Sequence, residues 1–172
     1  MLYFLGIFCI MTGAFGYGKA YMYRQKSHVL LLYRMESIFR LMQSEITYKK
    51  QSLPQACLEI GKRMPEKEGE ILTEIGRQAQ DGSGRGFREI WKEYWEVYLR
   101  DSPLELEERR ILLEISQFTG YEDEHIQQEM LERQKERLAD IRKRKEDKNR
   151  EQNKLVMTLS LSAGALLILL LL

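Results

Sequence analysis

Histidine, the side chain that most readily does acid–base or metal chemistry near neutral pH, is rare in this chain. His28 and His125 are far apart in the sequence. Glu124 and Glu129 lie close to His125 and would offer carboxylate ligands, but acidic residues occur at similar density throughout the central part of the chain. A solvated helix face is therefore the better interpretation of this cluster. We predict no metal ligands.

Nucleophiles and phosphate loops are equally poorly represented. Cys9 and Cys57 stand alone, so their spacing excludes both a disulfide framework and a zinc motif. The glycine-rich segment at residues 82–86 lacks the Lys-Ser/Thr ending of a phosphate loop and follows no predicted strand. Because no acid, base and nucleophile form a constellation, we predict no catalytic residues, no cofactor and no enzymatic activity.

The chain has 172 residues and nearly balanced charge, with 27 Lys and Arg against 26 Asp and Glu. A nucleic-acid-binding domain needs a marked basic excess, so this balance excludes nucleic acid as a predicted partner. The charge is unevenly distributed, because every charged side chain lies between Lys19 and Lys154. The two apolar ends must therefore be considered separately from the polar middle.

Both uncharged ends have the length and composition of membrane helices. Eighteen helical residues rise about 27 Å, close to the hydrocarbon thickness of a bilayer. We expect one membrane helix at residues 1–23, with Lys19 reaching toward the interface, and a second at residues 155–172. A cleaved signal peptide is the alternative for the first segment, although no basic residue precedes its apolar run. A buried core helix is the weaker alternative for the second.

Basic residues flank only the inner ends of the two expected spans. Lys19, Arg24 and Lys26 follow the beginning of the chain, and a run of Lys and Arg between Arg142 and Lys154 precedes its end. Lys and Arg near a span favour the cytoplasmic side of a membrane. The predicted topology is a hairpin with both chain ends outside and the middle of the chain in the cytoplasm.

The polar middle has helical periodicity and no alternating run long enough for a sheet. Apolar stripes predict helices at about Ser27–Lys50, after Leu53, around Leu72 and Ile75, over Phe87–Tyr98, and from Leu104 to about Phe118. The aromatic stripe of Phe87–Tyr98 is better interpreted as bundle core than as a cofactor site. The predicted fold is all-α, a cytoplasmic bundle of about six helices between N- and C-terminal membrane helices.

Helix starts can be placed from capping patterns. Ser52-Leu53-Pro54-Gln55 and Ser102-Pro103-Leu104-Glu105 both have the spacing of a capping box, so each serine is a predicted N-cap. The last helix is expected to begin near Asp123, and neither Gly nor Pro interrupts it before the second expected span. It should continue as a charged helical connector over residues 142–154, with a frayed charged linker as the alternative.

Four short motifs occur in order between the apolar ends. They are Glu45-Ile46-Thr47-Tyr48; Leu53-Pro54 with Ala56 and Ile60 after it; Trp91 after the loop that contains Gly84; and Gly120, Asp123 and Gln127 in the pattern G-x-x-D-x-x-x-Q. This arrangement resembles the stage III sporulation protein AB family of endospore-forming bacteria. The resemblance covers essentially the full chain. Residues 24–141 are in turn similar to the helical F domain of type II secretion platform proteins.

The resemblance implies a non-enzymatic membrane component of the channel complex between mother cell and forespore. It implies a position in the outer forespore membrane, with the helical domain in the mother-cell cytoplasm. The implied partners are the lipid bilayer, a secretion-type ATPase and other sporulation channel proteins, and a homo-oligomer stays open. The alternative function is a membrane-anchored sensor or enzyme with an unrecognised site.

Glu45, Tyr48, Asp123 and Gln127 are the candidate partner-interface residues. Glu45 and Tyr48 lie at the edge of the apolar stripe of their helix. Asp123 and Gln127 are one turn apart at the start of the last helix. The alternative is a purely structural role, in which Asp123 is an N-cap and Tyr48 packs its ring inside.

Overall fold

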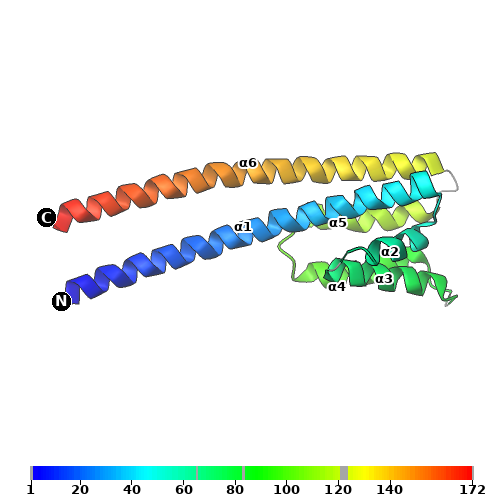
Figure 1. The fold of residues 1–172 in the computed structure, drawn as a ribbon, viewed down its shortest axis with the longest axis horizontal. Coiled ribbons are helices and arrows are strands. Elements are labelled where there is room, and N and C mark those ends of the chain that lie inside the picture. Colours follow the sequence, from blue (N-terminus) through cyan, green and yellow to red (C-terminus); the bar gives the residue numbers. More distant parts are fainter. Residues whose placement is uncertain (1, 65, 83, 121–123, 172) are drawn as a thin grey trace. The chain divides into compact units, whose positions relative to one another are not determined.

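The computed structural model describes residues 2–64, 66–82, 84–120 and 124–171, and the regular structure in these ranges is entirely helical. The helices are α1 (Leu2–Lys49), α2 (Leu53–Gly61), α3 (Lys67–Gln80), α4 (Phe87–Arg100), α5 (Leu106–Glu114), the 3-10 helix η1 (Ile115–Gly120) and α6 (Glu124–Leu171). Figure 1 shows them in chain order. The all-α fold class is confirmed for the described part of the chain.

The chain divides into two units. The central unit is Leu30–Ile141, and the terminal unit consists of the residues up to Val29 and from Arg142 onward. In the terminal unit, the side-chain amide of Gln25 donates to that of Gln152 at 2.9 Å, so the two segments contact each other there. Residues 142–154 belong to the continuous helix α6, which favours the helical connector over a frayed linker.

Among the described residues, no helix is long and apolar enough to cross a membrane. The side chains of residues 1–21, and of most residues from 157 onward, lie outside the description. The expected membrane helices at 1–23 and 155–172 depend on these apolar stretches. Both spans stay predictions.

α1 is a single helix that includes the segment expected as a separate helix from Ser27 to Lys50. Its N-terminal part continues into that segment because no proline interrupts it. The helix ends where Lys50 adopts a left-handed conformation with φ of 54°, and the amide of Gln51 then donates to the carbonyl of Glu45 at 3.2 Å. The fully buried residues Leu32, Met35 and Phe39 recur at helical spacing. They give the central unit its long apolar face.

α2 and α3 pack so closely that their contact requires glycine. A Cβ added to Gly61 would lie 2.2 Å from the hydroxyl of Thr73, and one added to Gly76 would lie 2.7 Å from the carbonyl of Pro54. Both distances are shorter than the contacts that a Cβ atom makes in real proteins, so any larger residue at these positions would push the two helices apart. The two glycines therefore set how near the helices approach.

The aromatic face of α4 is part of the core, as the sequence predicts. Trp91 and Trp95 are both fully buried, with ring centroids 5.5 Å apart. The indole Nε1 of Trp91 donates to the carbonyl of Leu112 in α5 at 2.9 Å. Trp95 in turn contacts the edge of the Tyr98 ring at a centroid distance of 5.7 Å. The hydrogen bond of Trp91 holds this aromatic face of α4 against α5, the helix that follows it.

Neither predicted serine capping box forms, although Ser52 is the N-cap residue of α2 and Pro54 lies in the first turn, as predicted. The Ser52 side chain makes no capping hydrogen bond. The second box is shifted by three residues, because Glu105 is the N-cap and exchanges hydrogen bonds with Glu108. The hydroxyl of Ser102 instead donates to the carbonyl of Leu99 at 2.8 Å, at the end of α4.

Replacing Trp91 should test how much the bundle depends on its aromatic core. Trp91→Ala removes a fully buried side chain, so we expect the free energy of unfolding to fall by about 3–5 kcal/mol. Val97→Ala on the same helix, at a side chain 62% exposed, should change it by less than about 0.5 kcal/mol. Denaturation followed by far-UV circular dichroism measures both. Unchanged melting of Trp91→Ala would contradict the central position of this side chain.

Candidate functional site

The carboxylate of Glu45 joins the end of α1 to the turn that follows α2. Its side chain is 2% exposed, and its oxygens lie 2.8 Å from Lys49 Nζ and 2.9 Å from a guanidinium nitrogen of Arg63. A carboxylate removed from water requires such partners, because the desolvation of an unpaired charge is expensive. Glu45 thus holds two elements of the central unit together, whatever part it has in binding a partner.

Tyr48 and Gln127 lie at about the same level along α1 and α6. The side-chain amide of Gln43 on α1 donates to Glu132 on α6 at 2.5 Å, and Lys135 donates to Gln43 at 3.4 Å. These contacts set an antiparallel register, and extending it by five residues brings Tyr48 level with Gln127. Tyr48 is 83% exposed, whereas Gln127 is partly buried.

The exposure of Tyr48 overturns one of its two expected roles. Its ring does not pack inside the bundle, so the structural alternative for this residue is wrong. Asp123 lies outside the described residues. The structure therefore brings Tyr48 and Gln127 to one end of the α1–α6 pair, with Glu45 one turn earlier on α1 and buried.

A second buried carboxylate, which sequence reasoning missed, connects three helices. Glu68 in the first turn of α3 is fully buried. Its Oε1 accepts a hydrogen bond of 2.6 Å from the hydroxyl of Tyr98 on α4, and lies 3.4 Å from a guanidinium nitrogen of Arg34 on α1. Arg34 also pairs with Glu66. Nothing in the sequence distinguishes Glu68 from the many solvated glutamates around it.

The thiol of Cys57 is not activated for nucleophilic chemistry. Cys57 is buried, and desolvation raises the pKa of its thiol far above the usual range, so it stays protonated and is a poor nucleophile. No group of three or more His, Cys, Asp and Glu side chains within the described ranges is arranged to hold a metal ion. Three of the buried polar residues of the central unit, Glu45, Glu68 and Gln134, instead connect their helices to other elements.

Taken together, these features define the class of an all-α helical bundle whose buried polar groups serve its packing. Comparison with known proteins identifies the family. The family model of Stage III sporulation protein AB matches residues 3–172, and the chain belongs to that family. The resemblance drawn from the four sequence motifs is thereby confirmed.

A solved structure supports the fold independently. The chain is similar to a structure titled "Stage III sporulation protein AB (SpoIIIAB)", with 16% sequence identity and a TM-score of 0.63. The match covers 72% of this chain and 96% of that one. At this identity the likeness concerns the fold alone. No curated protein matches the chain in a sequence search.

The buried Tyr98–Glu68 pair should make stability depend on alkaline pH. Burial, and then the hydrogen bond to Glu68, raise the pKa of Tyr98 well above its ordinary value of about 10. Because the pKa of Tyr98 is higher in the folded state than in the unfolded chain, the neutral phenol contributes its full stability at pH values below the unfolded pKa. This contribution is lost as the pH rises from the unfolded pKa toward the folded one. Tyr98→Phe should therefore lower stability at pH 7 but reduce the further loss between pH of about 9 and 11.

Chemical denaturation across that pH range tests this expectation. Tyr48→Phe is the matched control, because Tyr48 is exposed and its loss of a hydroxyl removes no buried hydrogen bond. If Tyr98→Phe and the parent chain lose stability equally at alkaline pH, the pair does not act as described.

Proposed function

We propose that this chain is a non-enzymatic platform in the channel complex between mother cell and forespore, where it docks a secretion-type ATPase and other channel proteins. The observation that carries the proposal is the family match, which spans residues 3–172 and therefore both ends and the middle of the chain. The expected resemblance of residues 24–141 to the helical F domain of type II secretion platform proteins would make a secretion-type ATPase the docked partner.

The arrangement of polar groups supports docking rather than catalysis. Buried Glu45 and Glu68 are engaged in contacts between helices. Tyr48 is instead a large, exposed side chain within one of the family's local motifs. An exposed aromatic residue is a common anchor in protein interfaces, because it buries much area at little entropic cost.

The family resemblance makes the outer forespore membrane the proposed location, and the charge pattern supports an orientation with the domain in the cytoplasm, which there is that of the mother cell. Apolar spans at 1–23 and 155–172 would anchor the chain, and the basic flanks at their inner ends would keep the middle on the cytoplasmic side. The central unit would then be held close to the bilayer, where a cytoplasmic ATPase can reach it.

Substitution of Tyr48 should separate docking from folding. With the full chain as bait in a sporulating lysate, Tyr48→Ala should reduce capture of the channel ATPase several-fold without a change in melting temperature, since the ring is exposed. Tyr33→Ala, at a half-exposed tyrosine on the same helix, is the control and should leave capture unchanged. Gln127→Ala should act like Tyr48→Ala.

Glu45→Ala should behave differently from these variants. It leaves Arg63 and Lys49 without their carboxylate, so we expect a loss of about 1–3 kcal/mol in the free energy of unfolding. Asp123→Ala extends the series to the fourth candidate. Normal capture by every variant, once stability is taken into account, would remove this end of the α1–α6 pair as the docking surface.

Topology can be tested without a binding partner. A reporter active only in the cytoplasm should be inactive when fused to the C-terminus, and active when inserted in the loop at residues 82–86, because the basic flanks face the middle of the chain. Strong activity of the C-terminal fusion would contradict the hairpin.

A further inference from the structure

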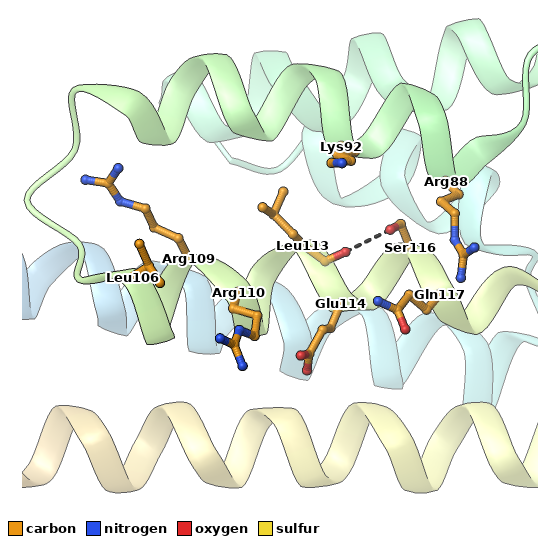
Figure 2. Close-up of a pocket in the computed structure, with 9 residues that line it drawn as sticks. All are labelled: Arg88, Lys92, Leu106, Arg109, Arg110, Leu113, Glu114, Ser116 and Gln117. Atoms are coloured by element: carbon orange, nitrogen blue, oxygen red, sulfur yellow. Dashed lines mark hydrogen bonds between the residues drawn. The ribbon is translucent and has the colours of Figure 1, made fainter.

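A basic pocket lies between α4 and α5 of the central unit, away from the residues discussed above. It has a volume of about 760 Å³. Its walls carry Arg88 and Lys92 from α4, and Arg109 and Arg110 from α5 (Figure 2). One carboxylate, Glu114, also lines it. The chain as a whole is nearly neutral, so this local excess of positive charge does not follow from composition.

The single carboxylate does not neutralise the pocket, because α6 engages it. Glu114 accepts a hydrogen bond of 3.0 Å from the side-chain amide of Gln134, and lies 3.7 Å from a guanidinium nitrogen of Arg137. Figure 2 shows its side chain directed away from α4, toward the helix drawn below it. The positive charges of the opposite wall therefore face no acid of their own inside the pocket.

α4 separates its charges between two faces. Glu89 and Glu93 both pair with Arg85, which lies in the loop before the helix. Arg88 and Lys92, also one turn apart, lie on the pocket side. Glu89 and Glu93 are thus engaged outside the pocket, whereas Lys92 has a solvent-exposed ion pair of 3.5 Å with Glu96.

Two of the pocket's arginines are available to a ligand. Within the described part of the chain, Arg88 and Arg110 have no hydrogen bond or ion pair, and both side chains are exposed. Arg88 also lies in the first turn of α4, where the helix dipole disfavours a cation. Arg88 therefore does not stabilise the start of α4, but an anion bound beside it would interact favourably with both the guanidinium and the helix dipole.

Arg109 is held differently. Its guanidinium donates to the carbonyl oxygens of Leu104 at 2.8 Å and Ser102 at 3.0 Å. These contacts fix the α4–α5 connection but bring no negative charge, so Arg109 adds to the positive potential of the pocket.

Apolar groups stand beside these cations. Leu106 is 79% exposed at the start of α5, and the partly buried Leu113 lies further along the same wall. The pocket combines several separated cations with leucine side chains. These features are complementary to a polypeptide that presents several carboxylates and an apolar side chain. A single phosphate group would need its donors gathered around one point, whereas here they are distributed along two helices.

We infer that this pocket, formed by Arg88, Arg110 and Leu106 with their neighbours, binds an acidic amphipathic segment of a partner protein. The inference deepens the docking role proposed above, and rests on it only for the identity of the natural partner. Carboxylates of the segment pair with Arg88 and Arg110, and its apolar side chain covers Leu106.

Binding of defined peptides to the purified full chain tests the inference. The probe is a fluorescently labelled helix-forming peptide with Glu on one face and Leu on the other. Two comparison peptides carry Lys in place of every Glu, or the same residues in scrambled order. We expect the acidic amphipathic peptide alone to bind well, with an affinity that falls as salt is added.

The double variant Arg88→Glu with Arg110→Glu should weaken this binding about tenfold or more, since it converts two attractions into repulsions. Arg40→Glu, at an exposed arginine of α1 outside the pocket, is the matched control and should bind like the parent chain. Leu106→Ser should weaken the Glu/Leu peptide but not a peptide with Glu and Ala only. Arg88→Gln with Arg110→Gln gives a second, neutral test should the double Glu variant melt early.

Unaltered peptide affinity in a normally melting double variant would overturn the inference, as would equal binding of the Lys peptide. Binding of inorganic phosphate or of phosphatidylglycerol vesicles that depends on Arg88 and Arg110, with no binding of the acidic peptide, would also overturn it. The docking role is tested separately. If the parent chain and the double variant capture the channel ATPase equally well, the pocket is not the binding site for the ATPase and the platform proposal stands. If the parent chain itself does not capture the ATPase, the platform proposal is wrong.

Discussion

The burial of Trp91 and Trp95 on one face of α4 is the constraint on which the rest of the central unit depends. A buried indole N–H is stabilised by an acceptor. Trp91 finds one in the carbonyl of Leu112, in the last turn of α5, where the last carbonyls of a helix lack partners within it. This hydrogen bond holds the end of α5 against α4, the two helices that line the pocket.

The buried carboxylates add specificity to this apolar arrangement. Glu68 gains its hydrogen bond and its ion pair only where Tyr98 and Arg34 arrive from two other helices, and Glu45 gains a second cation beside Lys49 where Arg63 arrives from the turn after α2. Such contacts contribute little net stability, because desolvation offsets most of the attraction. They do penalise any register that leaves a carboxylate unpaired. The packing of α1 against α2 and α3 is thus defined by charge as well as by shape.

Local patterns predicted most of the helices, and tertiary contacts explain what they missed. The aromatic stripe of α4 could be assigned to the core because its spacing is helical over three turns. The capping boxes failed because the hydroxyl of Ser102 was drawn to the carbonyl of Leu99, while Glu105 and Glu108 formed the box instead. Among the candidate interface residues, the exposure of Tyr48 and the burial of Glu45 depend on neighbouring helices, which a single sequence does not specify.

Glu68 and the basic pocket show why composition conceals the functional chemistry of a chain with balanced charge. Nearly equal numbers of acids and bases predict no preference for an anionic partner. Folding divides the two sets unequally, because Glu45, Glu68 and Glu114 are turned inward or toward a neighbouring helix, where each has a partner. The cations of α4 and α5 are left facing solvent around Leu106. A near-neutral sequence thereby presents a basic and partly apolar surface between α4 and α5, whose charge would attract an acidic partner.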